Sequence, residues 1–310
     1  MKKLIFVVAL TTNDNDYQIE QAVAAETAAQ ELDVNIQIVF AENDSILQSQ
    51  QLLKIIQASS ASRPDGIIFE PVGGTALPQV AGAAAAAGIG WVVLNRDVEY
   101  LADLRKAFRV PVFALTSDHV EVGRIQGRQL AALVPNGGSV LYIQGPSESL
   151  AAKQRNMGML ETKPASMQVK AIKGNWTEAS AHKAVTAWLR LSTSQHSVCD
   201  AIACQDDSMA IGARKAFQDL SDSALRDHWL SLPFLGCDGM PKTGQEWVKS
   251  GLLAATIIIP ANTGQALEML VHALQHGTVP PPRTLTAPVS FPDLKALATA
   301  RAKQARAGSQ

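Results

Sequence analysis

Short apolar runs alternate with amphipathic segments along the chain, at a spacing of about thirty residues, the length of one strand and helix of a parallel sheet. The apolar runs are continuous, which is typical of strands covered by helices on both faces. They predict strands at residues 4–10, 34–40, 66–69, 91–94, 112–115, 139–143, 168–172, 201–204, 234–237 and 254–259. The segments between them predict helices at residues 17–32, 46–58, 77–87, 120–134, 177–191, 208–220, 245–250, 264–275 and 294–306.

The strands fall into two sets of about five, with a break near Ser117 and Asp118. This order predicts an α/β protein of two similar lobes, each with a parallel sheet. We expect residues 261–286 to return to the first lobe, because a chain that crosses between lobes more than once makes a hinge. The predicted lobes are residues 1–117 with 261–286 and residues 118–260 with 287–310, with a ligand cleft between them.

Composition narrows the function classes. The 310 residues are 47% hydrophobic, which excludes intrinsic disorder, and the formal charge of −1 is unlike that of a nucleic-acid-binding protein. Because no stretch approaches the ~20 apolar residues of a membrane helix, we expect no membrane insertion. The three cysteines lie in apolar stretches, which favours buried thiols over a disulfide framework.

The amino terminus has the basic start and apolar run of a signal peptide. The run at residues 4–10 is only seven residues long, however, and polar residues 11–16 follow it in place of a small-residue cleavage site. We therefore expect residues 4–10 to be the first strand, and the chain as given to be cytoplasmic.

Candidate chemistry lies just after the predicted strands, since open α/β sheets bind ligands outside the carboxyl ends of their strands. The loops there are rich in amides, carboxylates and arginine, with two aromatic side chains. Such groups match the vicinal hydroxyls of a sugar, and its C–H faces pack on Trp or Tyr. Any one of these loops is more often a turn or a helix cap, so the argument depends on several converging. They are residues 13–18, 70–75, 95–97, 144–145 with Arg155, 174–176, 205–207 and 238–239.

Motifs for catalysis or metal binding are weak. The chain has no P-loop, no G-x-S-x-G elbow and no H-E-x-x-H, so we expect neither an enzyme nor a cofactor. Glu268, His272 and His276 share one helix face with the spacing of metal ligands, but a solvated polar face is the favoured interpretation, and no metal is expected.

Three sequence motifs carry a family resemblance. Residues 202–213, I-A-C-Q-D-D-S-M-A-I-G-A, resemble a strand-to-helix segment that usually ends N-D-x-M-A-x-G-A. Residues 235–239 resemble a G-[FY]-D-G turn, and residues 251–257 a G-x-L-x-A-T-[IV] strand. On these motifs the chain, over about residues 3–288, resembles the type 1 periplasmic binding proteins. Within that family it is similar to the ribose-binding-protein-like sugar binders, which share their fold with the ligand domains of lactose-repressor-type regulators.

The resemblance implies two Rossmann-like lobes with parallel sheets joined by a three-segment hinge, the periplasmic binding protein-like I fold. It also implies ligand-binding roles for nine residues. Asn95 and Arg96 match a pair that binds sugar hydroxyls, Trp176 an aromatic that stacks on the ring, and Arg155 an arginine of the second lobe. The remaining matches are Asn15, Tyr17, Glu70, Asp206 and Asp238.

Several positions depart from the family pattern. Asn95 replaces an aspartate, Asp206 replaces an asparagine, and Glu70 stands where ribose binders have an asparagine. The added carboxylates fit further hydroxyls, as in a hexose or inositol, or an amine, so ribose is not the implied ligand.

The function implied is non-catalytic binding of a monosaccharide or polyol by hinge closure, either for an ABC sugar transporter or as a sugar sensor. The expected partners are therefore the sugar and a transporter permease or a signalling protein, and not nucleic acid. In the family's usual compartment the chain would be periplasmic, as a processed form. The alternative is a ligand-sensing regulator without a DNA-binding domain of its own.

Overall fold

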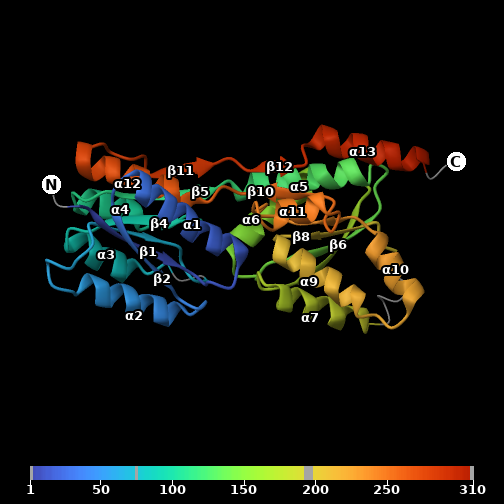
Figure 1. Ribbon diagram of the computed structural model, residues 1–310, viewed down its shortest axis with the longest axis horizontal. Helices are drawn as coiled ribbons and strands as arrows, with labels where there is room; N and C mark the ends of the chain where they lie inside the picture. Colours follow the sequence, from blue (N-terminus) through green and yellow to red (C-terminus); the bar gives the residue numbers. More distant parts are fainter. Residues whose placement is uncertain (1–2, 74–75, 192–197, 308–310) are drawn as a thin grey trace. The chain divides into compact units, whose positions relative to one another are not determined.

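The computed structural model of the protein describes residues 3–73, 76–191 and 198–307 (Figure 1). The chain divides into two compact units. Unit 1 is residues 1–117 with 261–286, and unit 2 is residues 118–260 with 287–310. The chain therefore passes from one unit to the other at three places, which we call the crossings: 117/118, 260/261 and 286/287.

Unit 1 is built on a parallel sheet with six strands among the described residues. Its strand order is β11-β5-β4-β3-β1-β2. The strands are β1 (Ile5–Leu10), β2 (Asn35–Phe40), β3 (Gly66–Phe69), β4 (Gly90–Leu94), β5 (Val112–Ser117) and β11 (Arg283–Thr286). Because all six run in the same direction, their carboxyl ends meet at one edge of the sheet.

Helices cover both faces of this sheet. Phe6 and Val8 of β1 pack in one core with α1 (Asp16–Glu31) and α12 (Asn262–His276). Val7 and Ala9, which point the opposite way, pack in a second core with α2 (Ser45–Ile56), α3 (Pro78–Ala86) and α4 (Leu101–Ala107). Both faces of β1 are thus apolar, which explains its continuous hydrophobic run.

Unit 2 has a parallel sheet of order β7-β6-β8-β9, with four strands among the described residues. They are β6 (Ser139–Gln144), β7 (Gln168–Lys173), β8 (Ala201–Cys204) and β9 (Phe234–Leu235). On one face pack α7 (Glu178–Leu189), α9 (Asp207–Gln218) and α10 (Ser223–Ser231), and on the other α5 (His119–Leu133), α6 (Leu150–Thr162) and α13 (Leu294–Ala307). The short helix α11 (Gly244–Lys249) follows β9.

Helices α5 and α6 touch backbone to backbone through two glycines. A Cβ atom at Gly123 of α5 would lie 2.0 Å from the carbonyl oxygen of Arg155, and one at Gly158 of α6 would lie 2.0 Å from that of Val120. Any larger residue would push the helices apart, so these glycines set the position of α6 and of Arg155 on it.

The predicted grouping of the strands into two sets of about five differs from the observed sheets in the number of strands in each. β11 adds a sixth strand to the first sheet, and β10 (Thr256–Ile258) pairs antiparallel with β12 (Val289–Phe291) in a separate two-stranded sheet. The pattern did not predict β12, α4 or α10, and it gave no bounds for β11 within the returning residues 261–286, since these elements are short and partly exposed. None of the helices described here is long and apolar enough to span a bilayer.

Candidate functional site

The five residues predicted in unit 1 follow strands that are neighbours in the sheet. Asn15 and Tyr17 come after β1, Glu70 directly follows β3, and Asn95 and Arg96 directly follow β4. The strand order therefore brings them to the same edge of the sheet. The loop after β3 was predicted to extend to residue 75, but residues 74 and 75 lie outside the described residues.

Asn95 joins three of the polar side chains of this edge. Its Nδ2 donates to the Tyr17 hydroxyl at 3.1 Å and to Glu70 Oε2 at 3.1 Å, and its Oδ1 accepts a hydrogen bond of 2.7 Å from Nδ2 of Asn262. Asn95 also has a φ of +55°, in the left-handed region that Asn tolerates better than most residues. A non-glycine residue held in this way is a common feature of ligand-binding sites.

Asn15 and Arg96 are the other two of the five predicted residues in unit 1. The Oδ1 of Asn15 accepts from the main-chain N–H of Gln18 at 3.2 Å and so caps α1. Burial lowers the pKa of Arg96, and the nearby Glu70 carboxylate opposes that effect. A guanidinium remains charged in either case, so this edge holds a cation beside an acid.

In unit 2, Arg155 contacts the main chain and two other predicted residues. Its side chain is nearly buried, and it donates to the main-chain oxygen of Gln205. Its guanidinium lies 5.4 Å from the centre of the Trp176 ring and 3.7 Å from Oδ1 of Asp238. The structure thus places a cation, an aromatic face and a carboxylate next to each other.

Trp176 and Asp238 both have unusual backbone conformations. Their φ angles are +60° and +111°, and the first is rare for so bulky a residue. The Trp176 indole packs directly on Gly145, where a Cβ atom would lie 2.2 Å from the ring. Gly145 is therefore required for this position of the indole.

Asp206 and Asp207 are both buried, and they hold the main chain around the predicted ligand-binding residues of unit 2. Asp206 caps α9, accepting from the N–H of Met209 at 2.5 Å. Asp207 accepts from the N–H of Gly239 at 2.7 Å and from the Thr256 hydroxyl at 2.6 Å, which holds the turn after Asp238.

Gln205 lies in one of the predicted loops, but the sequence does not predict its role. Fully buried, it accepts from the N–H of Gly145 at 2.8 Å and donates to the Tyr142 hydroxyl and the Ala152 carbonyl, both at 2.9 Å. It ties the loop after β6 to the first turn of α6, and so helps to place Arg155. Its position beside Asp206 is the one signal that could have identified it.

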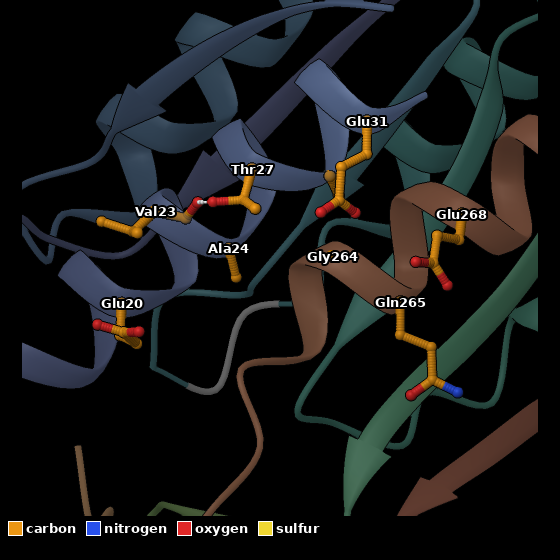
Figure 2. A pocket seen from close by; sticks show the side chains of 9 residues that line it. Glu20, Val23, Ala24, Thr27, Glu31, Gly264, Gln265 and Glu268 are labelled. Carbon is orange, nitrogen blue, oxygen red and sulfur yellow. Dashed lines mark hydrogen bonds between the residues drawn. The ribbon is translucent and has the colours of Figure 1, made fainter. Parts of the chain in front are cut away.

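A groove between α1 and α12 is separate from these residues (Figure 2). It has a volume of about 530 Å³, a floor of small residues and three glutamates. Its lining residues are Glu20, Val23, Ala24, Thr27, Ala28, Glu31, Gly264, Gln265 and Glu268, and no predicted site residue is among them. A Cβ atom at Gly264 would lie 3.2 Å from the carbonyl oxygen of Ala24, which shows how closely the two helices pack there.

Glu268, His272 and His276 are exposed on α12. The rings of the two histidines lie 5.3 Å apart. Among the residues that the structure describes, no group of three or more His, Cys, Asp or Glu side chains is arranged to hold a metal ion.

Comparison with known proteins agrees with the predicted resemblance. A family model described as a periplasmic binding protein domain matches residues 6–278. A "Putative rhizopine-binding protein" of Rhizobium meliloti is 30% identical over a stretch that covers 62% of this chain and 60% of that protein. The ribose import binding protein of Escherichia coli is 24% identical, over 83% of this chain and 79% of the relative.

Solved structures confirm the predicted fold class. A periplasmic solute binding protein from Actinobacillus succinogenes with bound D-allose superposes with a TM-score of 0.80 at 22% identity, covering 96% of this chain and 100% of the other. A Caulobacter myo-inositol binding protein bound to myo-inositol has a TM-score of 0.76 at 20% identity, covering 93% and 92%.

Proposed function

Because the chain belongs to the periplasmic binding protein domain family, we propose that it binds a small carbohydrate, a monosaccharide or polyol, without altering it chemically. One observation carries this proposal. In unit 1, hydrogen bonds link Asn95 to Tyr17 and Glu70, and the Arg96 guanidinium lies within electrostatic reach of Glu70. In unit 2, the Arg155 guanidinium lies beside the Asp238 carboxylate and over the Trp176 ring. Solved relatives with this fold contain D-allose and myo-inositol.

The chemistry of these groups suits a polyol. Carboxylates accept hydrogen bonds from hydroxyls, guanidinium groups donate to them, and an indole face packs on the C–H face of a ring. In this proposal Glu70, Asp206 and Asp238 act as acceptors and not as acid–base catalysts. A sugar-hydrolysis assay that released product from a glycoside would contradict the non-catalytic part.

We propose further that the predicted residues of unit 1 and those of unit 2 bind the same ligand from opposite sides, and that the units close by bending at the three crossings. A ligand held by both units would stabilise the closed state, which is the physical basis of such a switch. The proposed partner is the permease of an ABC transporter or a signalling protein, and the proposed compartment is the periplasm. The names of the ribose import relatives support the transport role.

Thermal unfolding of the purified protein tests the proposal. D-Ribose, D-allose, myo-inositol, D-galactose and simple amines would each be added at millimolar concentration. A ligand present at about 100 times its Kd adds about 2.7 kcal/mol of stability, which raises the Tm of a chain of this size by about 5 °C. A rise with a polyol supports the proposal, whereas a rise only with an amine would contradict the carbohydrate assignment.

Two variants locate the effect. Asp238→Ala should remove the rise because it deletes a carboxylate of the unit 2 set. Asp222→Ala is the matched control, since Asp222 caps α10 through the N–H of Leu225 and belongs to no predicted site. Equal ligand-induced rises in the two variants would exclude Asp238 from the site.

A further inference from the structure

We propose that Asn262 and Thr263, the first two residues of α12, are positioning residues for the ligand-binding side chains of unit 1. The ligand-binding part of this inference depends on the proposed function. Neither residue was predicted as part of the site, and neither is exposed: the accessible fractions are 1% for Asn262 and 0% for Thr263. Polar side chains this deeply buried are normally held by specific hydrogen bonds.

Asn262 fixes the amide of Asn95. Its Nδ2 donates to Asn95 Oδ1 at 2.7 Å and to Ser117 Oγ at 3.3 Å, while its Oδ1 accepts from the Thr286 hydroxyl at 2.8 Å. The hydroxyls of Ser117 and Thr286 are themselves 3.2 Å apart. With its oxygen and nitrogen both engaged, Asn262 leaves the Asn95 amide one orientation, with the nitrogen toward Tyr17 and Glu70.

Thr263 acts on Tyr17 through Gln21. The main-chain N–H of Thr263 donates to Gln21 Oε1 at 2.9 Å, and its hydroxyl donates to the Gln21 carbonyl oxygen at 2.5 Å. Gln21 is fully buried, and its Nε2 donates to the Tyr17 hydroxyl at 3.0 Å. The Tyr17 oxygen therefore receives two N–H groups, one from Gln21 and one from Asn95.

These bonds close a ring, which we call the α12 ring: Asn262, Asn95, Tyr17, Gln21 and Thr263, closed by the peptide bond between residues 262 and 263. Its two ligand-facing members, in the proposed function, are Tyr17 and Asn95. Because hydrogen-bonded networks act as a unit, removing either α12 residue should loosen both of these side chains. The two α12 residues would thus control binding without touching the ligand.

Fluorine NMR tests the ring without any ligand. The chain has three tyrosines, so protein labelled with 3-fluorotyrosine gives signals from Tyr17, Tyr100 and Tyr142, and Tyr17→Phe assigns the first. Asn262→Ala and Thr263→Pro should each shift or broaden the Tyr17 signal and leave the other two in place. Thr263→Pro removes the main-chain N–H that donates to Gln21 Oε1, at a first-turn position of α12 where proline is tolerated, so it provides the answer even if Asn262→Ala folds poorly.

The control is Gln129→Ala. Gln129 is a fully buried amide of unit 2 that donates to the Thr256 carbonyl and to the Ser290 hydroxyl. Replacing it removes a similar number of buried hydrogen bonds at a place outside the α12 ring. It should leave the Tyr17 signal unchanged. The positioning role is overturned if the Tyr17 signal keeps its shift and width in both variants of the α12 residues, or if Gln129→Ala changes it equally.

Binding measurements with D-ribose and myo-inositol test the functional consequence. Asn262→Ala should weaken binding about tenfold, and the double variant with Asn95→Ala should bind no more weakly than Asn95→Ala alone, since both changes remove the same arrangement. Independent, additive losses would contradict the inference. If the native protein binds neither probe, the proposed function fails for these ligands, whereas the fluorine spectra still decide whether the ring positions Tyr17.

Discussion

Replacing Gln205 by Met removes the three side-chain hydrogen bonds of a fully buried residue while nearly keeping its volume. The variant leaves the N–H of Gly145 and the hydroxyl of the fully buried Tyr142 without the amide that they contact. An orphaned buried polar group costs about 1–3 kcal/mol, so the two together should cost about 4 kcal/mol of unfolding free energy.

Urea unfolding followed by tryptophan fluorescence measures this loss in the affected unit. Of the five tryptophans, Trp91 lies in unit 1 and the other four lie in unit 2, so the signal reports mainly on unit 2. With a urea dependence of about 2 kcal/mol/M, the midpoint should fall by about 2 M. The control is Gln218→Met, the same substitution at an exposed position of α9, which should change stability by less than about 0.5 kcal/mol.

A Gln205→Met loss below about 1 kcal/mol would refute the reasoning. It would mean that Gly145 and Tyr142 find other partners at small cost, and that Gln205 does not hold the loop after β6 against α6. A large loss with unchanged affinity for a bound polyol would confirm the structural cost but exclude an effect on Arg155.

Three further predictions concern thiols, packing and pH. Burial raises the pKa of the thiols of Cys199, Cys204 and Cys237, so Ellman's reagent should find no reactive thiol in the folded protein at neutral pH. Unfolding in urea should make all three thiols reactive, and fast reaction of the native protein would contradict the prediction. Gly145→Ala should displace the Trp176 ring, change the fluorescence and weaken polyol binding, whereas Gly82→Ala, where a Cβ atom meets nothing within 4 Å, should do neither. Burial raises the pKa of Tyr100 to about 12, above its value of 10.0 in the unfolded chain, so its contribution to stability is present below pH 10 and is lost as the pH rises toward 12. Tyr100→Phe should therefore make the alkaline decline in unfolding free energy shallower between pH 10 and 12, and an unchanged slope would count against it.

The sequence predicted best those elements whose burial is complete. The strands at Gly66–Phe69 and Ala201–Cys204 are buried at every residue and have the predicted bounds, because a strand covered on both faces is a continuous apolar run. β11 at Arg283–Thr286 lies at the edge of its sheet with three residues at least partly exposed, so its sequence has no such run. Short helices such as Leu101–Ala107 have too few residues for a clear period.

The candidate site divides in a similar way. Asn95 and Arg96 could be predicted because they follow a strand directly, and the structure puts Asn95 in contact with Tyr17 and Glu70. Gln21 and Asn262 could not be predicted, because the sequence alone indicates a solvent-exposed position for an amide in a helix. In the structure, the packing of α12 on α1 buries both side chains. What identifies them is the tertiary contact and not the local pattern.

The place of β11 in the first sheet has a consequence for biosynthesis. As the chain leaves the ribosome, β5 emerges with one edge unpaired, and Leu267 and Leu270, which cover one face of this sheet, have not yet been made. The whole of residues 118–260 must be translated before α12 and β11 arrive to complete unit 1. The nascent protein therefore carries an exposed apolar sheet through nearly half of its synthesis, which is the kind of surface that chaperones bind and that aggregates in their absence.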